Sequence, residues 1–183
     1  MDDNLRGRLI TTFRWVDPGP HCDHLVSDRS GWWRDALVLA ALGPALAALF
    51  PEEQPTVVVA PEVTGFLVGP LVAAALGVGF VEAYKDGREQ RIAEPVTWAA
   101  TAADYRGREL RLGVRGRHLR TGDRVLLVDD WVASGAQSRA LGEVVTTLGA
   151  RTIGTAAIVA DCPATVAAEL SVRALLTGAD LAA

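Results

Sequence analysis

The hydrophobic positions along the chain fall into runs that glycine, proline and charged residues separate. Short apolar runs rich in β-branched residues are typical of strands buried on both faces of a sheet. They predict strands over residues 56–60, 79–84, 124–128, 152–160 and 172–176. Longer apolar or periodic runs predict helices over 32–50, with a kink or restart at Pro44, and over 66–76, 136–148 and 164–170.

The order of these elements indicates the fold class. Strand, helix and strand follow one another between residues 56 and 84 and again between 124 and 160, which is the order of a βαβ unit. We therefore predict an α/β fold with a mostly parallel central sheet flanked by helices. The length of 183 residues and the lack of a repeat or linker predict a single domain over 1–183.

Residues 86–107 interrupt this alternation with a polar and charged stretch. A polar connection of this length is uncommon in a compact domain unless it serves as a lid or binding loop, and we expect that role here. The residues that follow, 110–114, alternate between polar and apolar side chains as an edge strand does.

Composition and charge narrow the possible functions. Half of the residues are hydrophobic and 22% are charged, which excludes overall disorder. The net charge is −4 and the arginines form no long basic stripe, so we expect no nucleic acid as the main partner. The 18 basic residues are 17 arginines and one lysine, Lys85, which makes that lysine worth following.

One uncharged stretch is long enough to raise the question of a membrane. Residues 63–81 carry no charge, but they contain several helix- and strand-breaking residues, and a buried helix followed by a buried strand explains them better than a span. The acidic start of the chain has no hydrophobic signal region after it, and Cys22 and Cys162 show no metal-ligand spacing. We expect a cytoplasmic protein that does not enter the membrane.

The most informative segment runs from Val125 to Gln137. A buried strand leads into two adjacent acids, Asp129 and Asp130, at the edge where ligands bind in open α/β sheets. Small residues follow, and then a helix begins. Backbone N–H groups and the positive end of that helix would form a phosphate cradle, to which Ser134 adds a hydroxyl. Acids beside such a cradle suit a ligand that also presents sugar hydroxyls or a divalent cation.

This segment resembles the phosphoribosyl-pyrophosphate loop of the type I phosphoribosyltransferases, in which an apolar strand is followed by Asp-Asp and a small-residue turn. Further segments resemble the adenine phosphoribosyltransferase branch in consistent chain order. They are Pro18-Gly19, Glu62 to Gly69, Gly77 to Val81, Tyr84 to Arg88, Asp104-Tyr105 and Arg120 to Val125. The resemblance implies a small N-terminal hood over about 1–30 and a mobile catalytic loop over 86–107.

The resemblance implies a transfer of ribose 5-phosphate from phosphoribosyl pyrophosphate to an adenine-like purine base in nucleotide salvage. Asp129 and Asp130 would hold the ribose hydroxyls, and Asp129 would also meet Mg²⁺ through water. Lys85 and Thr64 would lie on the pyrophosphate side, and Asp104 would act as acid or base. The 5-phosphate would be wrapped by Ala133, Ser134, Gly135, Ala136 and Gln137.

The resemblance also implies a homodimer whose Mg²⁺ is bound mainly through the pyrophosphate of the substrate. The chain departs from the family where Thr64 and Tyr84 replace arginines and where Gln137 closes the phosphate loop. The aromatic residue that would stack on adenine is not evident, and Trp15 or His21 is a possible substitute. Two alternatives therefore stay open: a non-catalytic module that senses phosphoribosyl pyrophosphate or a nucleotide, and a phosphoribosyltransferase for a non-purine base.

Overall fold

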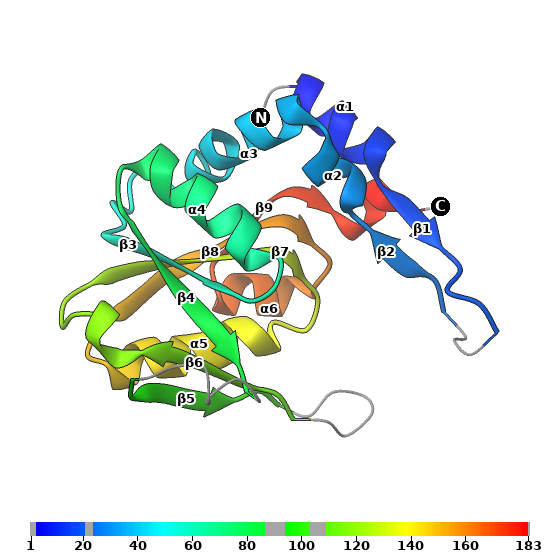
Figure 1. Ribbon diagram of the computed structural model, residues 1–183. Coiled ribbons are helices and arrows are strands. Elements are labelled where there is room, and N and C mark those ends of the chain that lie inside the picture. The colour runs from blue at the N-terminus through cyan, green and yellow to red at the C-terminus, as the bar shows by residue number, and fades with distance from the viewer. Residues whose placement is uncertain (1–2, 21–23, 87–93, 103–108, 183) are drawn as a thin grey trace.

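The main feature of the computed structural model, which describes residues 3–20, 24–86, 94–102 and 109–182, is a seven-stranded sheet (Figure 1). Its strands lie in the order β5-β6-β4-β3-β7-β8-β9. The parallel strands are β3 (Val57–Pro61), β4 (Gly79–Lys85), β7 (Arg124–Val132), β8 (Arg151–Ala160) and β9 (Val172–Thr177). The two antiparallel strands are β5 (Val96–Ala100) and β6 (Arg111–Arg115). The predicted α/β fold with a mostly parallel sheet is confirmed.

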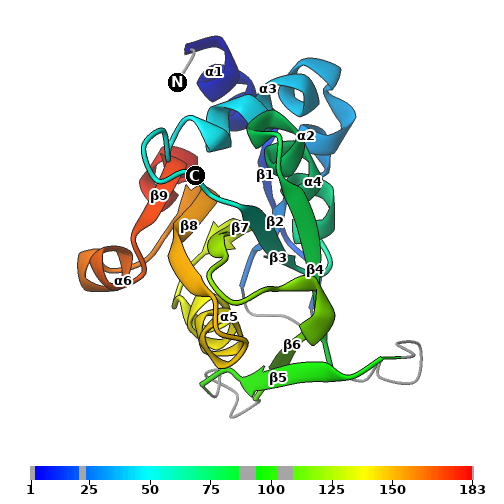
Figure 2. The same cartoon turned by 90° about the vertical axis from the view of Figure 1, so that its left-hand side faces the viewer.

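Helices cover both faces of this sheet (Figures 1 and 2). On one face lie α3 (Ala36–Ala47) and α4 (Gly65–Leu76), and on the other lies α5 (Ala136–Thr147). The side chains of β7 alternate between the two cores: Leu126 packs with α3 and α4, whereas Leu127 packs with α5. The short α6 (Ala164–Glu169) connects β8 to β9, and the 3₁₀ helices are η2 (Gly116–His118) and η3 (Gly178–Leu181).

The helix predicted over 32–50 is two helices in the structure, α2 (Ser30–Arg34) and α3. The chain breaks at Asp35, whose side chain accepts hydrogen bonds from the backbone N–H groups of Leu37 and Val38 and so caps α3. Pro44, where the sequence suggests a kink or restart, lies inside α3. The break therefore comes from the capping aspartate and not from the proline.

The segment expected to form a polar loop contains a strand. β5 lies within residues 86–107 and pairs with β6, so that β5 and not β6 is the outer strand. The reason is a close side-chain fit, because the Trp98 ring covers the backbone of Gly113 and the Arg111 guanidinium lies 5.4 Å from the centre of that ring. The prediction that 110–114 forms an edge strand is therefore wrong.

The N-terminal region forms a small sheet of its own, and its helix packs on the same hydrophobic core as one face of the main sheet. It contains α1 (Asp3–Thr12) and a hairpin of β1 (Arg14–Val16) and β2 (Val26–Asp28), none of which the hydrophobic pattern predicts. Trp15 places the hairpin beside the end of β7, since its ring lies 5.9 Å from that of Trp131 and its Nε1 donates to the Leu181 carbonyl at 2.7 Å. We call residues 3–29 the hood.

The uncharged stretch 63–81 forms α4 and the first half of β4, as its glycines and proline suggest. Within the described residues no helix is both long enough and apolar enough to cross a membrane.

Candidate active site

Two adjacent carboxylates lie near the carboxyl end of β7, in the middle of the sheet. Asp129 and Asp130 are 7% and 6% exposed, and the backbone N–H of Asp130 donates to Oδ1 of Asp129 at 2.9 Å. The apolar run over 124–128 predicts that the acids follow the strand, whereas β7 continues to Val132 and contains both. β8 pairs with β7 at Asp129 and again at Trp131, so the acidic pair belongs to a hydrogen-bonded strand and not to a loop.

The electrostatics of this pair favour a proton on Asp129. Burial raises the pKa of Asp129 well above the ordinary value of 3.8, and the charge of Asp130 raises it further. The nearby Lys85 ammonium acts in the opposite direction and lowers this pKa. A bound group that donates hydrogen bonds, such as a sugar hydroxyl, would relieve the repulsion between the two carboxylates.

A cavity of 270 Å³ opens above the acidic pair. It lies where β3 and β7 are neighbours and where the chain connections leave in opposite directions, which is the usual ligand position in an open α/β sheet. The lining comes from the hood, from the ends of three strands and from the first residues of α5. The lining residues are Arg29, Pro61, Glu62, Val63, Thr64, Gly65, Lys85, Asp129, Asp130, Trp131 and Gln137.

Lys85 and Thr64, for which the resemblance implies a place on the pyrophosphate side, both line this cavity. Lys85 is the last residue of β4, and Thr64 directly precedes α4. The neighbouring Tyr84 does not line the cavity, because consecutive strand residues point to opposite faces. Its hydroxyl donates to Glu82 and accepts from Arg115, and burial raises the pKa of Tyr84 to about 12.

The predicted phosphate cradle lies between the end of β7 and the start of α5. Residues 133–137 line a second cavity of 110 Å³ at the start of α5, and Asp129 lines it as well. Gly135 has a positive φ of 73°, a conformation that glycine adopts without strain. The Ser134 hydroxyl accepts from the backbone N–H of Ala136 at 3.3 Å. The cradle therefore has the glycine turn and helix N-terminus that suit a phosphate group.

Gln137 connects the two cavities, because its side chain lines both. Its Oε1 is buried and has no hydrogen-bond partner among the described residues. A buried amide oxygen without a donor is costly. Gln137 is thus placed to accept a hydrogen bond from a ligand that spans the two cavities.

Of the residues predicted for the site, Asp104 lies outside the described residues, as does His21. The cavity also contains Arg29, Glu62 and Trp131, whose roles the sequence does not reveal. Glu62 directly follows β3, and Trp131 directly follows the Asp-Asp pair. Their positions in the chain could therefore have indicated that they lie at the site. Arg29 has no such signal, since it reaches the site only through the folding of the hood.

Trp131 is one of the residues that line the cavity, and its ring packs against aromatic residues of the hood. Its ring stacks on that of Phe13 at 6.0 Å and meets that of Trp15 edge-on at 5.9 Å. Trp15 does not itself line the cavity but supports Trp131 from the hood. The indole is therefore held in one orientation beside Asp130.

A larger cavity of 690 Å³ lies between α5, β8 and α6. Its lining combines Arg139, Glu143 and Glu169 with threonine and serine hydroxyls and apolar side chains, and it does not include the carboxylate pair or Lys85. The two smaller cavities are the better candidate site, because the carboxylate pair, Lys85 and the cradle meet there.

Comparison with known proteins identifies the family of the chain. Residues 38–171 match the model of the phosphoribosyl transferase domain family. The adenine phosphoribosyltransferase of Oenococcus oeni is 32% identical over 162 residues, which cover 85% of this chain and 83% of that protein. The adenine phosphoribosyltransferase of Cupriavidus taiwanensis is 32% identical over 182 residues, which cover 97% and 85%.

Solved structures show the same fold. Adenine phosphoribosyltransferase from Rhodothermus marinus aligns with a TM-score of 0.81 at 24% identity, covering 96% of this chain and 99% of that one. The Trypanosoma brucei enzyme, solved with AMP, pyrophosphate and ribose-5-phosphate, aligns with a TM-score of 0.82 at 20% identity, covering 99% and 82%. The chain thus belongs to the phosphoribosyltransferase family, and its resemblance to the adenine phosphoribosyltransferase branch is confirmed.

Proposed function

We propose that this phosphoribosyltransferase moves ribose 5-phosphate from phosphoribosyl pyrophosphate to adenine or a similar purine base and releases pyrophosphate. One observation carries the proposal: the buried Asp129-Asp130 pair adjoins both the phosphate cradle and a cavity that contains Lys85. The cradle suits the 5-phosphate, the pair suits the ribose hydroxyls, and the cationic side suits pyrophosphate. The named activity of the curated relatives supports the same reaction.

In the proposed reaction the bond between ribose C1 and pyrophosphate breaks and a bond from C1 to a base nitrogen forms. Positive charge develops on the ribose and negative charge on the leaving group. Asp129 and Asp130 stabilise the ribose, while Lys85 stabilises the departing pyrophosphate. The base loses a proton as the new bond forms, and Asp104 is the proposed acid or base for that step.

Magnesium fits this site only together with the substrate. Among the described residues no group of three or more His, Cys, Asp or Glu side chains could hold a metal ion. The pyrophosphate would therefore supply most of the ligands, and Asp129 would contact the ion through water. Bound magnesium neutralises negative charge on the leaving group.

We propose that the base lies against Trp131. Trp131 lines the cavities on both sides of Asp129, and its ring packs against Phe13 and Trp15. Flat heterocycles stack well on such a ring. This arrangement would supply from β7 the aromatic surface that the hood sequence lacks.

The activity is tested by pyrophosphate release from phosphoribosyl pyrophosphate and Mg²⁺ with adenine, guanine, hypoxanthine, uracil and orotate in turn. We expect turnover with adenine. Trp131→Ala should raise the KM for the base by about 10-fold, since stacking on an aromatic ring contributes roughly 1–3 kcal/mol per base. The KM for phosphoribosyl pyrophosphate should stay near the wild-type value.

The other outcomes assign the alternatives. Turnover with uracil or orotate alone would indicate a transferase for a non-purine base. Calorimetric binding of phosphoribosyl pyrophosphate or AMP without turnover of any base would indicate a sensing module. Absence of both binding and turnover in folded protein would reject every one of these functions.

We propose a cytoplasmic homodimer. Val63 and Leu67, at the start of α4, are 68% and 49% exposed, and Leu37 of the adjacent α3 is 56% exposed. Large exposed apolar side chains of this kind favour association. Light scattering at micromolar concentration should give twice the mass of the chain, and Leu67→Glu should give the monomer mass. A monomeric wild-type protein would contradict this.

A further inference from the structure

Arg29 extends from the hood into the catalytic cavity. It follows β2 directly and precedes α2, and its Nη1 donates to Oδ2 of Asp130. The Arg29 side chain is 28% exposed and that of Asp130 is 9% exposed, so the ion pair is partly sheltered from water. The ion pair thus joins two residues of the cavity that lie 101 positions apart in the sequence.

The charge of the cavity shows why this residue matters. The ionisable lining residues are Arg29, Glu62, Lys85, Asp129 and Asp130, which gives two basic side chains against three acidic ones, of which Asp129 has a raised pKa. The substrate proposed for this cavity carries a pyrophosphate group. A polyanion next to several carboxylates needs cationic side chains at close range. Thr64, which directly precedes α4, also lines the cavity but is uncharged.

We propose that Arg29 is a pyrophosphate-binding residue. In the empty site its guanidinium neutralises Asp130. When phosphoribosyl pyrophosphate enters, the ribose hydroxyls donate to Asp130 in its place, and the guanidinium turns to the pyrophosphate oxygens. The hood thus supplies the second cation that the loop around Thr64 does not, and this inference rests on the proposed function.

The chemistry of arginine suits this exchange. A guanidinium has several N–H donors in a planar fork that matches phosphate oxygens in pairs. The recorded contact with Asp130 uses Nη1. The same group can therefore hold a carboxylate in the empty site and a phosphate in the occupied one without leaving the cavity.

Contacts other than this ion pair also attach the hood to the rest of the molecule. Trp15 contacts the Trp131 ring and donates to the Leu181 carbonyl, and the Trp32 Nε1 donates to the Leu9 carbonyl at 2.8 Å. Trp32 is fully buried. These contacts do not involve Arg29, so a substitution there should leave the fold intact.

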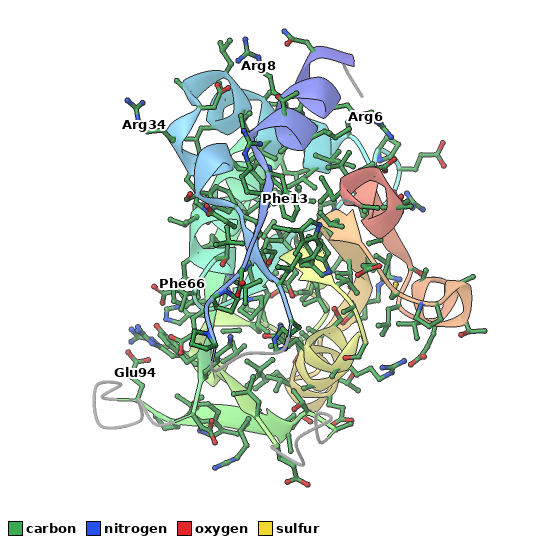
Figure 3. All side chains as sticks on the ribbon, turned by 90° about the vertical axis from the view of Figure 1, so that its right-hand side faces the viewer. Arg6, Arg8, Phe13, Arg34, Phe66 and Glu94 are labelled. Atoms are coloured by element: carbon green, nitrogen blue, oxygen red, sulfur yellow. The ribbon has the colours of Figure 1, made fainter. Side chains whose placement is uncertain are left out.

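Arg29→Gln should raise the KM for phosphoribosyl pyrophosphate by about 10- to 100-fold, the size expected when a charged hydrogen-bond partner is lost. The dissociation constant for magnesium pyrophosphate, measured by calorimetry, should rise by a similar factor. The KM for the base should stay near the wild-type value. Arg34→Gln is the matched control, since Arg34 in α2 projects away from the molecule in Figure 3.

Two further variants test the role of the charge itself. Lys85→Ala removes the other cation and should raise the same KM. Adding Thr64→Arg to Arg29→Gln returns a cation to the lining of the same cavity and should recover part of the lost affinity. Recovery would not follow if Arg29 only held the hood in place.

Each result bears on a distinct proposition. Unchanged affinity for phosphoribosyl pyrophosphate and pyrophosphate in Arg29→Gln would overturn the role of Arg29 and leave the proposed function standing. A lower melting temperature with equal losses for base and phosphoribosyl pyrophosphate, unrescued by Thr64→Arg, would also overturn it. If the wild-type protein binds neither phosphoribosyl pyrophosphate nor pyrophosphate, the proposed function fails and the inference about Arg29 fails with it.

Discussion

Asp129→Asn should suppress transfer and at the same time raise the melting temperature of the empty protein at neutral pH. Burial and the adjacent Asp130 raise the pKa of Asp129, which means that the folded state resists its ionisation. Asparagine keeps the shape of the side chain and removes the charge. The substitution therefore relieves a repulsion that the empty site contains.

The direction of the pH dependence follows from the raised pKa. The folded protein holds a proton on Asp129 at pH values where the unfolded chain, with a pKa near 3.8, has lost it. Stability is therefore lost as the pH rises from that value through the raised pKa of the folded state. The melting-temperature advantage of Asp129→Asn should be largest above the raised pKa and should shrink as the pH approaches 3.8.

The activity should fall by about 10²-fold, the typical effect of removing one electrostatic group that stabilises the transition state. Thermal melts across a pH series and pyrophosphate release measure the two effects on the same protein. Asp17→Asn, which alters an exposed carboxylate of the hood, should change neither. An Asp129→Asn protein that is less stable than wild type at neutral pH would contradict the electrostatic explanation.

The centre of the candidate site can be predicted from the sequence because its signals are local. β7, the Asp-Asp pair and the small residues before α5 follow one another without interruption, so a strand, two acids and a phosphate cradle are read from one segment. Lys85 could also be placed, since it follows the predicted strand 79–84 and the carboxyl ends of parallel strands lie at one edge of a sheet. Thr64, in contrast, is placed only by the resemblance to the adenine phosphoribosyltransferase branch.

The rest of the site depends on contacts between distant parts of the chain. Arg29 reaches Asp130 because the hood folds over the end of β7, and the short strands β1 and β2 carry too few residues to show a pattern. The hydrophobic pattern does not predict β5 for a related reason, because Trp98 packs on Gly113 across the strand pair and not on its sequence neighbours. Whether such short segments form strands depends on their tertiary contacts more than on their own sequence.

Gly135→Ala should damage the phosphate cradle. The residue has φ of 73°, and an added Cβ would lie 2.6 Å from Cδ1 of Leu170 and 2.8 Å from Cγ1 of Val166. The left-handed conformation alone costs a non-glycine residue about 1–2 kcal/mol, and the contacts with α6 add to this. We expect a lower melting temperature and a KM for phosphoribosyl pyrophosphate that rises by about 10-fold or more, as 1.4 kcal/mol of lost binding implies.

The damage should extend to α6, because Arg139 ties that helix to the cradle. Its Nη1 donates to the Ser134 carbonyl at 2.8 Å, and its Nε and Nη2 donate to Glu169 at 2.8 and 2.7 Å. A methyl group at Gly135 would displace α6. Because Arg139 is hydrogen-bonded to both Glu169 and Ser134, this displacement would also shift Ser134. The effect on phosphoribosyl pyrophosphate should therefore exceed what strain at one residue would cause.

Gly142→Ala provides the matched control in the same helix. An added Cβ there has only the Thr152 hydroxyl within 4 Å, at 3.8 Å, and alanine favours a helix over glycine by about 1 kcal/mol. This variant should be as stable as wild type or more so, with unchanged kinetics. If both glycine variants bind phosphoribosyl pyrophosphate equally well, the phosphate does not depend on the left-handed turn at Gly135, and residues 133–137 are not its cradle.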